Sequence, residues 1–498
     1  MSKENKSKLS LTTLILMIFT SVYGFANMPK AFYLMGYSAI LWYIIASLGF
    51  SIPYAFMMAE YGAAFRKERG GIYSWMAKSV GPKYAFIVTF MWYSSNLIWL
   101  VSNSSSIWIP FSNLLYGKDT TNSWSFFGLS VPHTMALLGS ILIILITYAA
   151  SKGLKSIKKV TSIGGTVVLL SNLVLIIGAI TIFISNGFKA AEAINKSAFI
   201  SSPNLDYTSP IGILGFLVFA IFAYGGLEAV SGLVDETKDA KKTFPKGLMI
   251  ASIIIALGYA TGILCVGLFT NWKEVLSGDT VNLANVAYIV IQNLGVKLGE
   301  AFGMSLDSSL LLGEWFARYI GLSMLLALIG AFFTISYAPI KQLIEGTPKE
   351  IWPKKWTLLN ENNMPVNAMW IQCLVVVIFI ILASCGGDSA NKFFSYLILM
   401  GNVAMTIPYM FLSGAFPAFK KKKDIERPFT MYKSYKASLI WSIIVTFTIG
   451  FSNIFTIIKP VIQDKDYKAM AFQITGPIIF VIIAFILYHN YEKKIKHK

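Results

Sequence analysis

Long runs of apolar residues, each about 20 residues in length, recur from one end of this sequence to the other. An α-helix needs about that length to cross the roughly 30 Å of hydrocarbon in a bilayer. A segment in lipid must also satisfy its own backbone hydrogen bonds, which a helix does. The short alternating strands of a membrane β-barrel are not visible in the sequence. We therefore expect an all-α integral membrane protein.

Hydropathy places twelve transmembrane helices in the chain, with boundaries good to about four residues. Only 13% of the residues are charged, about half of the share that is usual in soluble domains. No soluble domain interrupts the spans, so residues 1–498 are expected to form a single polytopic membrane domain. The spans lie near 9–34, 38–60, 84–115, 132–151, 160–185, 210–233, 247–270, 311–340, 366–384, 393–418, 437–458 and 470–490.

Lysine and arginine alternate sharply between successive loops. If the N-terminus is cytoplasmic, the inner segments hold 31 of the 42 basic residues. The positive-inside rule therefore predicts that both termini are cytoplasmic. The net charge of +18 follows from this topology, with the anionic lipids of the inner leaflet as its neighbours and no nucleic acid as a partner.

Two spans are interrupted near their middle by glycine and polar residues. The first contains the sequence TSVYGF over residues 20–25, and the sixth contains FAYGG over residues 222–226. Glycine lowers helix stability by roughly 1 kcal/mol, and carriers place polar sites where membrane helices are broken. Close helix packing through small residues is the alternative explanation, and the spacing alone leaves both open.

Several motifs resemble those of the amino acid–polyamine–organocation transporters, and most closely the bacterial glutamate/GABA antiporter group. The central motif is ERGGIYSW over residues 68–75, followed by a Gly-Pro pair in the predicted loop between spans 2 and 3. The resemblance covers nearly the whole chain. Its other elements are Glu60, Tyr224 to Glu228, Asp235 to Pro245, and Glu314 to Arg318.

The resemblance implies a fold of two inverted repeats of five helices each, followed by two further helices. The first repeat would be 9–185, the second 210–418, and the final pair 437–490. It also implies alternating access around a central site, and we expect a place in a bacterial inner membrane. The three cysteines and three histidines lack the spacing of metal ligands, so no metal is expected, and no cofactor is expected either.

The same resemblance implies which residues hold the substrate. Backbone amides at the first break would bind a carboxylate, which suits the partial positive charge of a helix N-terminus. Backbone groups at the second break would bind the ammonium, and Phe222 would act as an aromatic gate. The predicted binding residues are Ser21, Val22, Tyr23, Gly24, Phe222, Ala223, Tyr224, Gly225 and Gly226.

One wall of the expected site departs from the resembled group. In the glutamate/GABA exchanger, helix 8 presents an acidic residue and a tryptophan, where this chain has Ala331 and Ile335. This wall is therefore more apolar, and a neutral amino acid is at least as plausible a substrate as glutamate or GABA.

Charged residues inside spans are costly and each needs an explanation. Glu228 follows the second break, where it could couple protonation to gating or cap backbone groups freed by the break. Glu314 and Arg318 are four residues apart on one helix face, so we expect an ion pair that is structural or forms an outer gate.

Other side chains are assigned more ordinary roles. Glu60 is expected to form an interfacial ion pair with a nearby arginine, and Lys30 to point to water. Trp92, Trp99 and Trp108 lie in span 3, which faces the site in the resembled proteins, although lipid or interface contact would also explain them.

These observations predict a secondary amino-acid transporter, and specifically an antiporter. The alternative is a proton-coupled symporter for amino acids or polyamines. An ATP-driven pump is excluded by the lack of a phosphate-binding loop, and an intramembrane enzyme by the lack of paired catalytic groups within the spans. A channel is a weaker alternative, and whether the protein forms a homodimer is left open.

Overall fold

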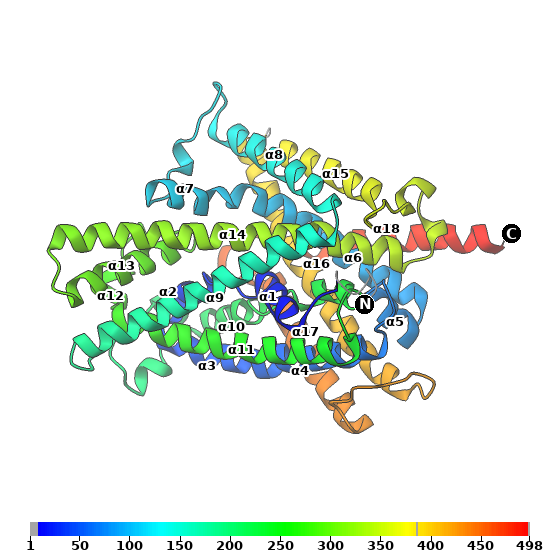
Figure 1. Cartoon of the computed structure of the whole chain (residues 1–498), viewed down its shortest axis with the longest axis horizontal. Coiled ribbons are helices and arrows are strands. Elements are labelled where there is room, and N and C mark those ends of the chain that lie inside the picture. The colour runs from blue at the N-terminus through cyan, green and yellow to red at the C-terminus, as the bar shows by residue number, and fades with distance from the viewer. Residues whose placement is uncertain (1–7, 385–386, 497–498) are drawn as a thin grey trace.

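The chain is built of helices joined by loops (Figure 1). The computed structural model describes residues 8–384 and 387–496, so residues 1–7, 385–386 and 497–498 of the predicted domain lie outside it. Within the described residues the strand-like pairing is a single bridge between Leu9 and Thr237. The α-helices are α1 (Leu11–Val22), α2 (Asn27–Met35), α3 (Ala39–Ala46), α4 (Ile52–Ala64), α5 (Ile72–Ser79), α6 (Pro82–Ser106), α7 (Trp108–Tyr116), α8 (Val131–Ser151), α9 (Leu154–Ser185), α10 (Pro210–Phe222), α11 (Ala240–Phe269), α12 (Trp272–Val275), α13 (Val286–Ala301), α14 (Leu306–Gly346), α15 (Val366–Ser384), α16 (Gly387–Lys421), α17 (Tyr435–Asp464) and α18 (Tyr467–Lys496).

These helices account for all of the predicted spans. Eleven helical stretches of the described chain are long and apolar enough to cross a membrane, and α1 is a shorter apolar helix in front of them. Span 9–34 contains α1 and α2, span 38–60 contains α3 and α4, and each later span coincides with one long helix or an interrupted one. The predicted fold class, an all-α membrane protein with many spans, is confirmed.

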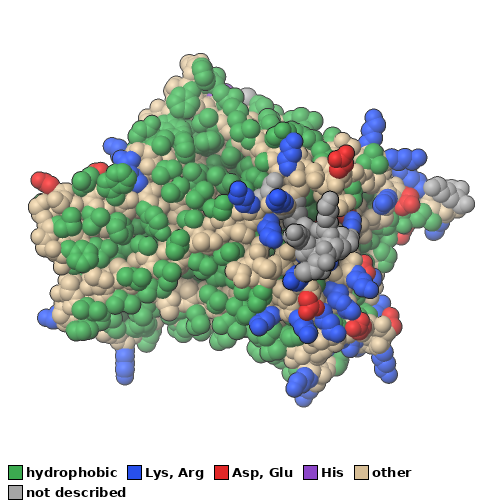
Figure 2. Space-filling model, viewed as in Figure 1, with side chains coloured by type: hydrophobic (Ala, Val, Ile, Leu, Met, Phe, Trp, Pro, Cys, Tyr) green, Lys and Arg blue, Asp and Glu red, His purple; other side chains and the backbone are tan. Residues whose placement is uncertain are grey.

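Basic side chains gather at one end of the molecule. Most of the lysine and arginine side chains visible in Figure 2 lie on its right half, where Figure 1 shows α5 and the C-terminal end of α18. Hydrophobic side chains cover much of the rest of this face. We call this end, which carries the ion pairs Lys83–Glu492 and Arg66–Glu426, the basic end.

The two predicted helix breaks are present, and they touch each other. Residues 23–26 separate α1 from α2, and residues 223–226 separate α10 from a 3₁₀ helix, Leu227–Leu233. Gly226 has a φ of 114°, which side chains rarely adopt, and a Cβ at this position would lie 2.4 Å from the Ser21 carbonyl oxygen. Only glycine permits this approach of the two broken segments.

Helix α1 is held in place by close packing against α9 and α14. A Cβ on Gly165 of α9 would lie 2.3 Å from the Leu16 carbonyl oxygen, so these backbones are in direct contact. Gly330 of α14 faces α1 from another side, where a Cβ would lie 3.3 Å from the Thr20 side chain. Small residues at helix interfaces allow this proximity in membrane proteins. The first break is therefore supported on two sides.

Helix α13 differs from the sequence expectation. The amphipathic stretch over residues 281–294, in the loop after the seventh predicted span, indicates by sequence alone a segment on the membrane surface, but α13 buries Val290, Leu294 and Leu298 and packs along α14. Its apolar face therefore contacts protein, which a short amphipathic pattern alone cannot distinguish from contact with lipid. The division of the chain into inverted repeats 9–185 and 210–418, with a final pair 437–490, stays a prediction.

Candidate functional site

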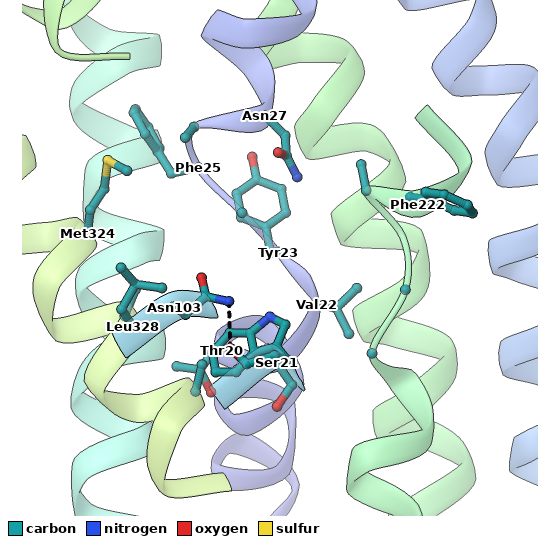
Figure 3. A pocket seen from close by; sticks show the side chains of 18 of the residues that line it. Thr20, Ser21, Val22, Tyr23, Phe25, Asn27, Asn103, Phe222, Met324 and Leu328 are labelled. Atoms are coloured by element: carbon teal, nitrogen blue, oxygen red, sulfur yellow. Dashed lines mark hydrogen bonds between the residues drawn. The ribbon is translucent and has the colours of Figure 1, made fainter. Parts of the chain in front are cut away.

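A cavity of about 670 Å³ lies between the two helix breaks, a size suited to a small molecule (Figure 3). Its walls come from both breaks, from α6, α14 and α16, and from the start of α13 with the loop before it. Glu228 lines it as well. The predicted binding residues that line it are Ser21, Val22, Tyr23, Gly24, Phe222, Ala223, Gly225 and Gly226.

Tyr224 was also predicted to bind substrate, but it faces away from the cavity. Its side chain is buried, and its hydroxyl donates to the Tyr43 carbonyl oxygen at 3.2 Å. Its ring packs edge-on against Tyr259, with 5.3 Å between ring centroids. A buried tyrosine uses its apolar ring and its hydroxyl in this way to fix local structure. Tyr224 therefore supports the second break from behind.

Unpaired backbone amides at the first break lie slightly later in the chain than predicted. The Gly24 amide donates to the Tyr259 hydroxyl at 3.0 Å, whereas Ser21 and Val22 belong to α1. The amides of Phe25 and Ala26, which also line the cavity, have no acceptor among the described residues. They precede the first turn of α2, where the helix dipole favours negative charge.

Tyr259 of α11 connects the two breaks and was missed in the sequence. Its hydroxyl accepts from the Gly24 amide at 3.0 Å and from the Asn27 side chain at 3.2 Å. It donates to the Ala223 carbonyl oxygen at 3.1 Å. A polar aromatic residue close to glycines within an apolar span was the available signal, but its partners are about 36 and 235 positions away.

Glu228 is buried and holds the second break through Tyr409 of α16. Glu228 Oε1 accepts from the Tyr409 hydroxyl at 2.9 Å and from Trp92 Nε1 at 3.2 Å. The Tyr409 hydroxyl in turn accepts the Gly226 amide at 3.2 Å. One oxygen is thus structural, while the other, Oε2, is buried without a hydrogen-bond partner among the described residues.

The three tryptophans of the predicted third span, two on α6 and Trp108 on α7, do not share one role. Trp92 is fully buried against Glu228, so the lipid-contact interpretation is wrong for it. Trp99 lines the cavity and packs against Phe332, with 5.2 Å between ring centroids. Trp108 Nε1 is buried and has no partner among the described residues.

The α14 side of the cavity is apolar. Figure 3 shows Met324 and Leu328 opposite the first break, and Ala331 and Ile335 continue this wall. The α6 side is more polar, with Asn103 donating to the Trp99 carbonyl oxygen at 3.0 Å. The expectation of an apolar wall from helix 8 agrees with this lining.

The cavity opens at the end of the molecule opposite the basic end. Ser106, Leu283 and Ala284, which line it there, are exposed. Glu228 and Tyr409, at its other end, are buried. The cavity is therefore accessible from one end of the molecule only.

Gln342 of α14 closes the cavity toward the basic end. Its Oε1 accepts from the Ile72 amide and from the Ser231 hydroxyl, each at 3.0 Å. Its Nε2 donates to the Glu228 carbonyl oxygen at 3.5 Å. One buried side chain thus joins α5, α14 and the 3₁₀ helix that follows the second break.

A cluster of ion pairs lies beyond Gln342. The buried Lys341 ammonium contacts Asp235 at 3.1 Å and Glu236 at 3.3 Å, and Arg69 contacts Glu345 at 3.2 Å and Asp235 at 3.9 Å. Burial raises the pKa of Asp235, although Lys341 opposes the shift. We call Arg69, Asp235, Glu236, Lys341 and Glu345 the inner ion-pair cluster.

The predicted Glu314–Arg318 ion pair is wrong. Among the described residues no ion pair joins them: Glu314 is exposed, while the Arg318 guanidinium donates to the carbonyl oxygens of Leu114 and Leu115. It also lies 5.6 Å from the centre of the Trp315 ring. Spacing on a helix permits a pair but does not compel it, because another element can offer better acceptors.

Glu60 also has different partners from those predicted. It is fully buried, pairs with Lys420 Nζ at 2.8 Å, and accepts from the amides of Met431 at 2.7 Å and Tyr432 at 2.6 Å. It therefore joins α4 to α16 and to the loop before α17 within the protein interior.

Lys30 was expected to point to water. It is half-buried and lines the open cavity, one turn into α2.

Comparison with known proteins gives matches over nearly the full length of the chain. The family model described as amino acid permease matches residues 9–486. The chain is 51% identical to the inner membrane transporter YjeM of Escherichia coli, over 98% of this chain and 97% of that one. It is 23% identical to the aspartate/glutamate permease AcaP of Lactococcus lactis subsp. cremoris, over 96% and 94% of the two chains. It is 20% identical to the glutamate/gamma-aminobutyrate antiporter of Lactococcus lactis subsp. lactis, over 91% and 85%. The resemblance drawn from the sequence motifs is confirmed.

Proposed function

The chain belongs to the amino acid permease family, and from that premise we propose that it is an antiporter that exchanges amino acids by alternating access. The transporters named among its relatives carry aspartate, glutamate or gamma-aminobutyrate, which supports an amino acid as the cargo. We extend to this chain the inner-membrane location given for its relative at 51% identity.

One observation carries the proposal: two helix ends of opposite polarity face the same cavity. The N-terminus of α2 offers the unpaired amides of Phe25 and Ala26, and the C-terminus of α10 offers the carbonyl groups near Phe222. A helix N-terminus favours an anion and a C-terminus favours a cation. An α-amino acid carries a carboxylate and an ammonium on the same carbon atom, so it matches this arrangement. We propose that the Phe222 ring acts as the aromatic gate of this site.

Alternating access is supported by the asymmetry of the cavity. It is open at one end, while Gln342 and the inner ion-pair cluster close the other. These closing contacts are polar and join separate elements, so they can be exchanged for others when the opposite side opens. The gathering of basic residues beyond them supports cytoplasmic termini and an outward-open state for this conformation.

The exchange mechanism is tested in proteoliposomes loaded with one radiolabelled amino acid at a time. The vesicles are diluted into buffer with or without unlabelled amino acids outside. We expect label to leave only when an amino acid is present outside. Accumulation driven by an imposed pH gradient without a counter-substrate would overturn exchange in favour of proton symport.

Proton symport is the second candidate, and Glu228 is the observation that favours it. This carboxylate lines the cavity, and its Oε2 has no partner among the described residues. If the protein is an exchanger, protonation of Glu228 would change the pH dependence of exchange without driving net transport of the amino acid.

The Glu228→Gln variant is expected to fold and to show a flattened pH profile of exchange. The glutamine carbonyl can accept from Trp92 and Tyr409 as Oε1 does, but the side chain no longer titrates. The measurement is exchange rate against pH, with size-exclusion profiles in detergent as the control for folding. An unchanged pH profile would leave Glu228 with a structural role alone.

A further inference from the structure

Lys30 places a positive charge in the wall of the cavity. It lies on α2 four residues after Ala26, so the two Cα atoms are about 6 Å apart along the helix axis. Ala26, Asn27 and Lys30 all line the cavity. Side chains of an α-helix lean toward its N-terminus, so the lysine stem is directed toward the end of α2 that offers unpaired amides.

The Lys30 ammonium has no ion-pair partner in the part of the chain that the structure describes. Of the residues lining the cavity, only Lys30 and Glu228 carry charge. Glu228 lies at the closed end, where Tyr409 and Trp92 bind it. An unpaired cation within a membrane span is costly, which makes a missing anionic partner the natural explanation.

We propose that Lys30 binds a second carboxylate of the substrate, so that the preferred cargo is an acidic amino acid. This inference rests on the proposed function, because it assumes that the α-carboxylate occupies the amides of Phe25 and Ala26. Aspartate and glutamate separate their carboxylates by two and three carbon atoms. That spacing suits two anion-binding groups about one helical turn apart.

The remaining walls agree with this cargo. The methylene groups of a short dicarboxylate can pack against Met324 and Leu328, which need no polar partner. A diamine or a basic amino acid would place a second cation near Lys30 with no additional carboxylate to receive it. A neutral amino acid would leave the Lys30 ammonium unpaired in the occupied site.

The test compares Lys30→Met with the wild type for half-saturation of exchange by aspartate, glutamate, leucine and serine. A hydrogen bond to a charged group contributes about 1.5–3 kcal/mol, so we expect half-saturation for the preferred acidic amino acid to rise about 10- to 100-fold. Leucine and serine should change much less. Lys459→Met is the matched control, because Lys459 is a half-buried lysine in the spanning helix α17 that does not line the cavity.

Lys30→Arg keeps the charge and is expected to retain the preference for the acidic amino acid. An equal loss for acidic and neutral substrates in Lys30→Met would overturn the inference, because Lys30 would then bind the α-carboxylate that all of them share. If Lys30→Met does not fold, the inference is tested by competition between amino acids for exchange by the wild-type protein. Aspartate or glutamate should compete better than leucine, serine, arginine or putrescine.

The two proposals fail in different ways. Wild-type exchange of neutral amino acids without aspartate or glutamate would overturn the role of Lys30 and leave the exchanger intact. The absence of any amino-acid flux from reconstituted, folded protein would overturn the proposed function itself.

Discussion

Gly226→Ala is expected to insert and fold but to lose amino-acid exchange by about 30-fold or more. The added methyl group meets the Ser21 carbonyl oxygen at 2.4 Å, and the residue must hold a φ of 114°. Backbone strain costs about 1–3 kcal/mol and overpacking about 1–3 kcal/mol, so the two breaks cannot keep their contact. The measurement is radiolabelled exchange in proteoliposomes, normalised to the amount of folded protein.

Gly414→Ala is the matched control for this variant. Gly414 also lies in a membrane span, on α16, but a Cβ there meets no atom within 4 Å. Its exchange rate should stay close to that of the wild type. Wild-type exchange by Gly226→Ala would contradict a site that depends on the close approach of the two breaks.

Lys341→Met is expected to destabilise the closed inner end and make the cavity accessible from the basic end. It leaves Asp235 and Glu236 without the cation that binds both of them. Breaking a buried ion pair by removing one partner costs about 3–5 kcal/mol. We therefore expect lower thermal stability in detergent and a shift toward a state in which the inner ion-pair cluster is separated.

Accessibility is measured with Ala229→Cys, which places a thiol on the cavity wall, in a background without the three native cysteines. A charged thiol reagent added from the basic side should label Lys341→Met faster than the parent. Adding Asp235→Asn, which removes one of the stranded negative charges, should recover part of the stability. Equal labelling rates with and without Lys341 would show that the cluster does not hold the cavity closed.

The spans could be predicted because their cause is local, whereas the spacing alone left a helix break and close packing both open at the two interruptions. Hydrocarbon thickness sets the length of each apolar run, and the Tyr-Gly pairs at 23–24 and 224–225 stop two of those runs. The presence of a cavity between the breaks followed from the resemblance. Even there the prediction was off by a few residues, since the Gly24 amide is already bound by Tyr259.

The supporting contacts could not be predicted because they join residues far apart in the chain. Glu60 was assigned to a nearby arginine, whereas its cation, Lys420, is 360 positions away. Tyr409 lies 181 positions from the Glu228 carboxylate that it binds. A single sequence shows which side chains are costly to bury but not which distant partner will satisfy each of them.

The burial of Glu60 has a consequence for how the helices can move. It joins α4, α16 and the loop before α17 through one ion pair and two backbone amides, so separating any of them would strand a charge or a donor. These elements are therefore expected to travel as one unit whenever the cavity changes sides. Movement that opens the inner end is therefore expected between this unit and other elements, such as α14, which carries Lys341.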